Sequence, residues 1–415
     1  MINNDLLEIV LKKYNLKNFN FYGDEIINSF FLGLKLLQNN KDKNVLILTK
    51  NNYISNKLYN AFSLVLPKEK VILIPSDELI RVEYISQSKE MLAQQVSSLN
   101  EIIKSKNSIA IASIQSCFRF YPTKKVFLDS IIKLKVGEEI DLDFLKHKIT
   151  EIGYYRVNKI DQSLQFASRG DILDIYSLNY DDPIRIEFFD NVIESIRFFH
   201  VNDQSSYTKT NSVEILPATL NLLSEDEIKN AKNTILQQSE KDLKHFLNQQ
   251  DRDEFINNVN NEIENFEENR YSNQFYKYIG FLQGFHCNLT DFFNEDYLII
   301  SNKIENEANL SRLISESDSF LNELFELRKC ISNLHYFSLD NCNLNKSLII
   351  YENENLIKDE RNITANITPP RYVFSKQSVG INIFDVYKKD GYKIICFIEN
   401  LIFYKKTFKL LNSIM

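Results

Sequence analysis

The sequence predicts an α/β protein: a parallel sheet that is interrupted by an α+β insertion and followed by a small α/β unit. Up to about residue 121, near-continuous apolar runs of strand length alternate with amphipathic segments, the pattern of buried parallel strands between helices. From residue 122 to about 210, short strands follow one another with polar turns between them, which is typical of an antiparallel sheet. The buried-strand pattern returns at residues 296–301, so we expect the first unit to be completed after the insertion.

The first unit contains three expected strands and two expected helices. The strands are the apolar runs at residues 44–49, 71–75 and 108–113. The segments at 52–66 and 89–106 place apolar residues three and four positions apart, which makes one face of a helix apolar. Strands that alternate with helices predict a parallel sheet with helices on both of its faces.

The insertion is expected to hold one helix followed by four strands. The helix covers residues 142–153, and the strands cover residues 154–160, 165–177, 184–189 and 192–199. Asp190 and Asn191 fit a two-residue hairpin turn between the last two strands, because both residue types tolerate positive φ.

The pattern after the insertion completes the expected domain organisation. Two long helices are expected at residues 224–250 and 252–270, and a final strand and helix at residues 391–415. The expected domains are the two parts of the parallel-sheet domain at 1–121 and 211–331, the inserted α+β domain at 122–210, and a small α/β domain at 332–415.

Composition and charge argue against several classes of protein. The chain of 415 residues has a net charge of -7, so it lacks the overall basic character of a protein that grips nucleic acid by itself. No apolar run approaches the roughly 20 residues of a membrane helix, and the first residues are unlike a secretory signal, so we expect a cytoplasmic location. Five cysteines without a CxxC pair argue against a disulfide framework or a zinc site.

A search for catalytic motifs finds none. A phosphate-binding loop needs clustered glycines and then Lys with Ser or Thr, but Gly23 precedes two acidic residues and the chain has no Gly-Lys-Ser or Gly-Lys-Thr. Ser301-Asn302 ends a strand where a nucleotide motor would carry Asp-Glu. Asp77 and Glu78 follow another strand, but a proline and a serine separate them from it. The five histidines lie outside any nucleophile motif, so we expect no catalytic residues, no metal site and no cofactor.

One stretch of the insertion, residues 165–189, carries an unusual pattern of outward residues. Alternation along residues 184–189 puts three apolar residues on one face and Arg185, Glu187 and Phe189 on the other. Arg169 precedes Gly170, whose free φ would permit a bulge that re-aims the arginine. Arginine beside an exposed aromatic ring is the composition of a protein-interface hot spot. A solvated sheet face with one stray apolar residue fits the pattern equally well.

A tight hairpin at Asp190-Asn191 has an unfavourable consequence. It sets Glu187 directly opposite Glu194, and like charges in a cross-strand pair destabilise a sheet unless a cation lies near them. The residues alone do not name that cation.

The same stretch resembles a known family. The run "GYYRVNKI...FASRGDILDIY...DPIRIEFFDNVIESIRFF...VEILPA" is similar to "GY.RV...EFA.RG.ILDIFP...PVRIEFF.D.IESIR.FD...ILPA" in the N-terminal module of the bacterial transcription-repair coupling factor family, Mfd. "VLILTKNNYISNKLYNAF" and "SKEMLAQQVSSLNEII...SIAIASIQSCFRFYP" are similar to the first domain of that family. The likeness spans most of residues 1–301 and, more weakly, the rest; its insertion motif is shared only with the related excision-repair helicase UvrB.

Departures from UvrB favour the coupling-factor family. UvrB carries an intact phosphate loop, an Asp-Glu metal motif and a tyrosine-rich hairpin, and in their places this chain has "GDEIINSFF", Ser301-Asn302 and "SDELIRVEYISQSKEM". The N-terminal module of the coupling factor is known for having lost the same features. The resemblance therefore implies a degenerate RecA-like sheet domain that holds the insertion, without enzyme activity in this segment.

The resemblance also implies a partner. In both families the inserted domain docks on the damage-recognition ATPase UvrA, and the motif positions that carry this contact match Arg169, Arg185 and Phe189 of this sequence. Glu187 and Arg156 are weaker candidates for the same contact.

Three positions depart from the family pattern. Leu164-Gln165 replaces the usual Gly-Glu, and Ser205 replaces an arginine, so the affinity or the local turn is expected to differ. In the full family protein an RNA-polymerase-binding domain and an ATP-driven DNA translocase follow. This chain ends before either begins, so we expect RNA polymerase and DNA to be contacted only through those downstream domains, and we expect no ATPase activity, translocation or polymerase release.

Three functions follow from these observations. The first is a non-catalytic recruitment module that binds UvrA and links stalled transcription to nucleotide excision repair. The alternative is a UvrB-like ATP-dependent DNA helicase subunit, which nucleotide binding would support. The third is direct binding of DNA by the module, which the acidic balance of the chain predicts to be weak.

Overall fold

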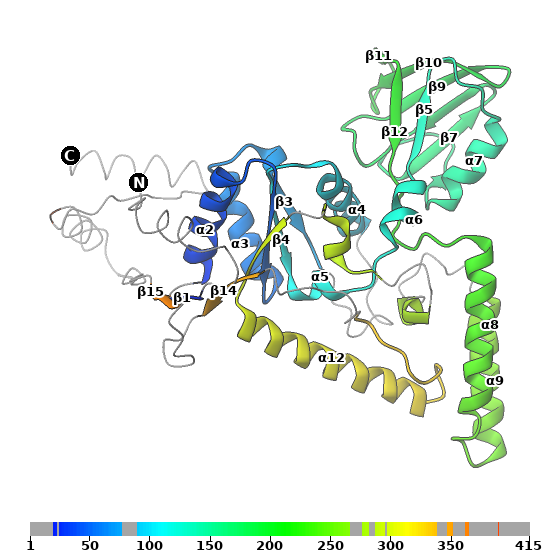
Figure 1. Ribbon diagram of the computed structural model, residues 1–415. Coiled ribbons are helices and arrows are strands. Elements are labelled where there is room, and N and C mark those ends of the chain that lie inside the picture. Colours follow the sequence, from blue (N-terminus) through cyan, green and yellow to red (C-terminus); the bar gives the residue numbers. More distant parts are fainter. Residues whose placement is uncertain are drawn as a thin grey trace, which may run out of the picture.

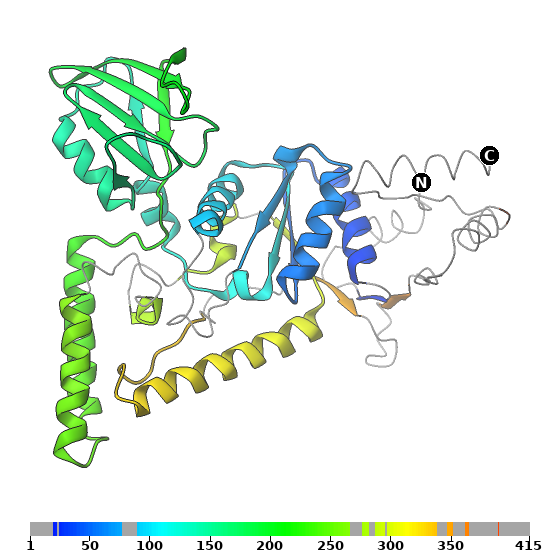
Figure 2. The same ribbon diagram turned by 180° about the vertical axis from the view of Figure 1, so that it is seen from behind.

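The computed structural model describes residues 20–22, 25–76, 89–265, 276–281, 287–294, 297–337, 347–351, 362–364 and 389 of the chain. These residues form a large parallel sheet with helices on both faces, an inserted unit with its own, mainly antiparallel sheet, and a pair of long helices that project away from the main sheet (Figures 1 and 2).

The main sheet has seven strands in the order β15-β1-β14-β13-β2-β4-β3, and its pairings are parallel. β2 and β4 are buried at every residue, as their continuous apolar sequences predict. The strands expected near residues 44–49, 71–75, 108–113 and 296–301 are confirmed. The seven strands are β1 (Asn20–Tyr22), β2 (Asn44–Thr49), β3 (Val71–Ile74), β4 (Ile109–Ser113), β13 (Tyr297–Ser301), β14 (Ser347–Tyr351) and β15 (Asn362–Thr364).

Alternate side chains of these strands enter two hydrophobic cores, one on each face of the sheet. Val45 and Ile47 of β2 pack in the core that is covered by α2 (Glu25–Asn39) and α3 (Asn52–Ser63). Leu46 and Leu48 enter the opposite core, which is covered by α4 (Lys89–Lys104), α5 (Ile114–Phe118) and α12 (Lys303–Glu326). The predicted parallel sheet with helices on both faces is confirmed, whereas the RecA-like arrangement stays a prediction.

Strands from the beginning and the end of the described chain meet at one side of the main sheet. β1 lies between β14 and β15, with Phe21 opposite both Ile350 and Ile363. The sequence predicts a small unit of its own for residues 332–415, yet these two strands extend the main sheet. The strand and helix expected at residues 391–415 lie outside the described residues.

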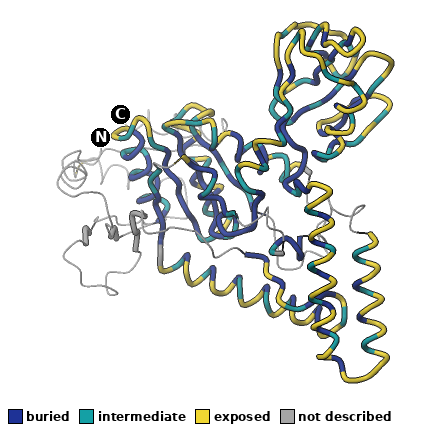
Figure 3. The backbone as a smooth tube through the Cα atoms, turned by 45° about the vertical axis from the view of Figure 1, so that its right-hand side comes forward, coloured by how far each residue is buried: buried dark blue, intermediate teal, exposed yellow. Residues whose placement is uncertain are grey.

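Two long helices, α8 (Glu225–Asp242) and α9 (Gln249–Glu264), form a hairpin that projects away from the main sheet and meets the end of α12 (Figure 1). Ser224 begins α8 with a capping box, in which Ser224 and Glu227 each accept a hydrogen bond from the backbone amide of the other. Asp242 accepts hydrogen bonds from the amide and the hydroxyl of Ser332, at 2.8 and 2.7 Å, and so ties the hairpin to the segment after α12. Figure 3 shows that the outer sides of these helices are exposed while the strands of the main sheet are buried.

The inserted unit follows α6 (Lys124–Asp129) and contains a six-stranded sheet in the order β11-β10-β9-β8-β7-β6, a two-stranded sheet β12-β5, and α7 (Leu142–Glu151). The neighbours β6 and β7 are parallel, and the other pairs are antiparallel. Its strands are β5 (Ile132–Lys135), β6 (Tyr155–Arg156), β7 (Gln165–Arg169), β8 (Ile172–Ile175), β9 (Ile184–Phe189), β10 (Val192–Phe199), β11 (Ser206–Thr210) and β12 (Ser212–Ile215).

Two details of the inserted unit differ from the sequence prediction. Residues 165–177, predicted as one strand, form the hairpin of β7 and β8, because Gly170 (φ +57) and Asp171 turn the chain between the paired residues Arg169 and Ile172. β12 lies beyond the domain boundary expected at residue 210, and it pairs with β5 of the insertion.

A separate core holds the inserted unit together. Leu145 and Ile149 of α7, together with Leu134 of β5 and Val213 of β12, cover one face of the six-stranded sheet. In the described part of the chain, no such layer covers the other face over most of β8, β9 and β10, where exposed and half-buried residues alternate with buried ones. Among the described residues, no helix combines the length and the apolarity needed to cross a bilayer.

Candidate partner-binding face

The six-stranded sheet has one covered face and one open face. Ile184, Ile186 and Phe188 of β9 are buried in the core beneath α7, with at most 5% of each residue exposed. Arg185 and Glu187 are half-buried on the other side, and Phe189 is 71% exposed. The alternation predicted for residues 184–189 is therefore confirmed.

Cross-strand pairing places the remaining residues of the open side. Directly paired residues have their side chains on the same side of a sheet. Arg185 is paired with Asp174 on one side and with Arg197 on the other, and Glu187 is paired with Ile172 and with Ser195. Ile172 is also paired with Arg169, and Phe189 is paired with Val192. We define the open face as the surface made by Arg169, Ile172, Asp174, Arg185, Glu187, Phe189, Val192, Ser195 and Arg197.

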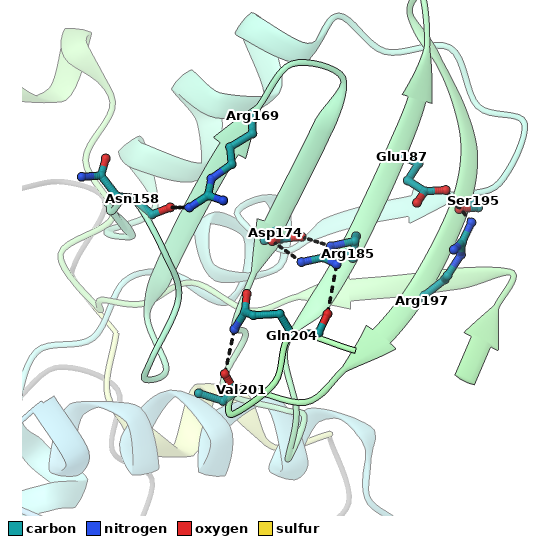
Figure 4. A network of polar contacts seen from close by, with 9 residues as sticks. All are labelled: Asn158, Arg169, Asp174, Arg185, Glu187, Ser195, Arg197, Val201 and Gln204. Atoms are coloured by element: carbon teal, nitrogen blue, oxygen red, sulfur yellow. Dashed lines mark hydrogen bonds and ion pairs between the residues drawn. The ribbon is translucent and has the colours of Figure 1, made fainter. Parts of the chain in front are cut away.

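Arg185 lies in the middle of the open face and is held by three neighbours, of which Figure 4 shows Asp174 and Gln204. Its Nε and Nη2 donate to the two carboxylate oxygens of Asp174 at 2.8 and 2.9 Å, a bidentate ion pair between adjacent strands. Its Nη1 donates to the backbone oxygen of Gln204 at 3.2 Å, and its guanidinium carbon lies 4.5 Å from the centre of the Phe199 ring. The hydrogen bonds to Asp174 raise the pKa of Arg185, which reinforces its positive charge.

Glu187 faces Ser195 and Arg197. Ser195 Oγ donates to Glu187 Oε2 at 2.7 Å, and Arg197 Nη2 donates to the same oxygen at 2.5 Å. The predicted pairing of Glu187 with Glu194 is wrong, because Glu194 is the extra residue of a β-bulge between Ile193 and Ser195. The bulge leaves Glu187 opposite a hydroxyl group, with Arg197 as the nearby cation that the sequence could not name.

Arg169 ends β7 at the rim of the open face. Its Nη2 donates to the backbone oxygen of Asn158 at 2.6 Å. Within the described ranges of the chain, no carboxylate forms an ion pair with Arg169, in contrast to Arg185. The bulge predicted at Gly170 is wrong, because this glycine lies in the two-residue turn that follows Arg169.

Phe189 and two neighbours form the apolar part of the open face. Ile172 is 36% exposed and Val192 is 39% exposed, and Val192 pairs directly with Phe189 across the hairpin. This pairing confirms the predicted turn at Asp190-Asn191, in which Asp190 adopts a φ of +54. An exposed aromatic ring is thus paired with one partly exposed apolar side chain, and Ile172, opposite Glu187, adds another to the same face.

Arg156 lies apart from the other four site candidates. In β6 it pairs with Phe166, which is buried in the core on the α7 side of the sheet. The pKa of Asp143 in α7 is lowered, chiefly by its hydrogen bond to Lys146, and the charge of Arg156 contributes to the same shift. The structure therefore brings Arg169, Arg185, Glu187 and Phe189 together and places Arg156 on the covered side.

A pocket of about 410 Å³ opens on the open face between Arg169 and Arg185. Sequence reasoning missed Asn158, Lys159 and Gln204, because they come from loops that only the folded chain brings over the sheet. Neither periodicity nor a motif marks these three residues. The pocket is lined by Asn158, Lys159, Ala167, Arg169, Ile172, Asp174, Arg185 and Gln204.

The residues that depart from the family pattern have local structural roles. Leu164 is buried and adopts a φ of +69, a conformation for which glycine is the usual residue. Gln165 is buried, and its side-chain oxygen accepts hydrogen bonds from two loop amides at 2.9 and 3.3 Å. Ser205 donates its amide and its hydroxyl to Asp203 at 2.9 and 2.6 Å. The first two residues shape the loop that borders the pocket.

The strand ends of the main sheet, where the sequence was searched for a nucleotide-binding motif, are described in part. No group of three or more His, Cys, Asp or Glu side chains in the described ranges could hold a metal ion. At the end of β13, Asn302 caps α12 by accepting a hydrogen bond from the Glu305 amide at 3.4 Å, so an amide stands where the motif search sought an acid pair. Gly23, Asp77 and Glu78 lie outside the described residues.

Comparison with known proteins matches the insertion and most of the rest of the chain. Residues 132–220 match the family model of the UvrB interaction domain. The chain is 27% identical over 299 residues to the transcription-repair-coupling factor of Bacillus subtilis, a match that covers 72% of this chain and 25% of the relative. It is 25% identical over 301 residues to the transcription-repair-coupling factor of Staphylococcus aureus, a match that covers 70% of this chain and 25% of the relative. It is 26% identical over 293 residues to that of Staphylococcus haemolyticus, a match that covers 68% of this chain and 24% of the relative.

The chain spans about a quarter of the length of these curated relatives. The segment that matches the UvrB interaction domain contains every residue of the open face. The resemblance seen in the sequence is confirmed: the inserted unit matches the model of the UvrB interaction domain, and the similarity to transcription-repair-coupling factors over about 70% of the chain supports their N-terminal, UvrB-homology module.

Proposed function

We propose that this chain is a non-catalytic recruitment module of transcription-coupled nucleotide excision repair, which brings UvrA to stalled transcription complexes through the open face. One observation carries the proposal. Arg169, Arg185 and Phe189 lie together on an accessible sheet face within the segment that matches the UvrB interaction domain. Contacts with RNA polymerase and DNA belong, in this proposal, to further domains of the family protein.

The chemistry of the open face supports a protein interface. Phe189 supplies an exposed aromatic anchor, and Arg169 at the rim supplies donors that suit an acidic group of a partner. The ion pairs of Arg185 with Asp174 and of Arg197 with Glu187 hold the polar groups in fixed positions. A face that is ordered before binding loses less side-chain entropy when the partner docks.

Titration calorimetry of this chain with UvrA tests the proposal. Arg169→Ala or Arg185→Glu should weaken binding by about 2 kcal/mol or more, roughly 30-fold in Kd, as central hot-spot residues do. Phe189→Ala should act in the same direction, and Phe144→Ala is its matched control, because Phe144 is 53% exposed on α7 at the covered side. Unchanged binding in a double variant of Arg169 and Arg185 that still folds would exclude this site.

A UvrB-like ATP-dependent helicase subunit is the alternative that the sequence left open. It predicts that the chain binds ATP in the presence of Mg²⁺. Calorimetric titration of the wild-type chain with Mg-ATP distinguishes the two functions, because a recruitment module should give no binding heat. Direct DNA binding is tested by a gel shift with duplex DNA at physiological ionic strength, where we expect no stable complex.

A further inference from the structure

The pocket on the open face contains more cationic groups than its internal ion pair can neutralise. On the basis of the proposed docking function, we propose that this pocket receives a carboxylate side chain of the protein partner. Lys159 and Arg169 bind the carboxylate, and Arg185 forms a fixed wall of the pocket. Lys159 is thereby a recognition residue that neither the family motif nor strand alternation indicates.

The charges of the lining residues favour an anion. Lys159, Arg169 and Arg185 contribute three cations, and Asp174 contributes one carboxylate. Arg185 and Asp174 neutralise each other through their bidentate pair at 2.8 and 2.9 Å. Lys159 is exposed and, like Arg169, forms no ion pair with a carboxylate in the described ranges. The uncompensated charge of the pocket is therefore carried by Lys159 and Arg169, and a complementary group on the partner is negative.

The pocket has room for an acidic side chain, and part of its surface is apolar. Its volume of about 410 Å³ lies within the roughly 300–1,000 Å³ of ordinary binding pockets. Ala167 is small and 5% exposed, and together with Ile172 it gives the pocket an apolar part. The methylene groups of a glutamate or aspartate could pack there while the carboxylate meets the two cations at the rim.

The bonding of the two arginines assigns them different roles. Arg185 uses Nε, Nη1 and Nη2 for Asp174 and Gln204 and stacks on the buried ring of Phe199. A partner carboxylate could form an ion pair with Arg185 only by displacing Asp174. Arg169 donates to a backbone oxygen of Asn158 at the rim, and its charge remains available (Figure 4). Arg185 is thus a positioning residue, and Arg169 is a contact residue.

Charge reversal at Lys159 tests the proposal, with UvrA as the probe in titrations at two salt concentrations. Lys159→Glu should raise the Kd by at least about tenfold, and Lys159→Ala should raise it by a smaller factor. Both variants should make binding less sensitive to salt, because a charge pair is lost. Lys135→Glu is the control: it makes the same change of charge at an exposed position on the separate β12-β5 sheet.

Phe189→Ala, measured in parallel, shows whether a negative result refutes the pocket proposal alone or also the proposed docking function. If Phe189→Ala weakens binding and Lys159→Glu does not, the pocket proposal is wrong and the docking face remains. If the wild-type chain does not bind UvrA, both proposals fail. Recovery of binding when Lys159→Glu meets a Glu→Lys or Asp→Lys variant of the partner would identify the carboxylate that enters the pocket.

Discussion

Arg185 and Asp174 neutralise each other on the open face through two hydrogen bonds of 2.8 and 2.9 Å. Arg169, at the rim of the same face, instead donates to the backbone oxygen of Asn158. The family motif treats the two arginines alike, but their surroundings differ. The side chains that can replace them should therefore differ as well.

Lysine substitutions distinguish the two arginines. Arg185→Lys should weaken UvrA binding by about tenfold, because lysine forms neither the bidentate pair with Asp174 nor the stack on Phe199. Arg169→Lys should change the Kd by less than about threefold, since it keeps a positive charge at the rim. Calorimetric titration of both variants measures the difference, and equal losses would contradict the separate roles.

Deletion of Glu194 should be tolerated, because this residue is the extra one in the bulge of β10. Without it, Ser195 still faces Glu187, and the ladder becomes regular. We expect the free energy of unfolding in urea to fall by less than about 1 kcal/mol. Deletion of Ser195 is the matched control, since it sets Glu194 opposite Glu187 and should be more destabilising. A larger loss from deleting Glu194 than from deleting Ser195 would contradict the assigned register.

Two glycines with positive φ should differ in their tolerance of alanine. Gly153 (φ +97) follows α7, and a Cβ there would lie 3.0 Å from Thr219 Cγ2. Gly137 (φ +85) has no heavy atom within 4 Å of the same position. Both variants introduce backbone strain of about 1–2 kcal/mol, and Gly153→Ala adds a steric clash. Thermal unfolding should show the lower Tm for Gly153→Ala, and equal Tm values would exclude the clash.

The ion pair between Lys104 of α4 and Glu214 of β12 joins the main unit to the insertion. The hydrogen bond from Lys104 holds the pKa of Glu214 below the ordinary value of a glutamate. A carboxyl group with a lowered folded-state pKa stabilises the fold above its unfolded-state pKa, and this contribution is lost as the pH falls through the folded-state value.

Glu214→Gln should therefore lower the free energy of unfolding slightly at pH 7 and progressively less towards about pH 3. The effect should be small because the side chains of Lys104 and Glu214 are 51% and 33% exposed, so solvent screens the pair. Urea unfolding of the wild type and the variant at both pH values measures it. A difference that stays constant with pH would show that the charge of Glu214 is not its cause.

The sequence predicted the strands whose own hydrophobic pattern reports which of their faces are buried. β2 and β4 are buried at every position, so an unbroken apolar run identified them. β9 has one covered and one open face, so strict alternation identified Arg185, Glu187 and Phe189 as outward residues. In both cases the information lies within a few consecutive residues.

The features that the sequence did not predict depend on partners elsewhere in the chain. The bulge at Glu194 changes which residue faces Glu187 but leaves the local alternation almost unchanged. Gly170 is compatible with a bulge or a turn, and only the pairing of β7 with β8 decides between them. The pairing of Arg156 with Phe166 determines on which face of the sheet Arg156 lies. Lys159 lines the pocket because of the conformation of the loop that contains it.

The position of β1 between β14 and β15 determines when this strand can assemble. β2, β3 and β4 lie within residues 44–113, so a growing chain can pair them early, whereas both neighbours of β1 come from residues 347–364. At about 5–20 residues per second, translation leaves the first strand unpaired for on the order of tens of seconds. We therefore expect the centre of the main sheet to form first and β1 to join late, which makes the newly made N-terminal strand a candidate for chaperone protection.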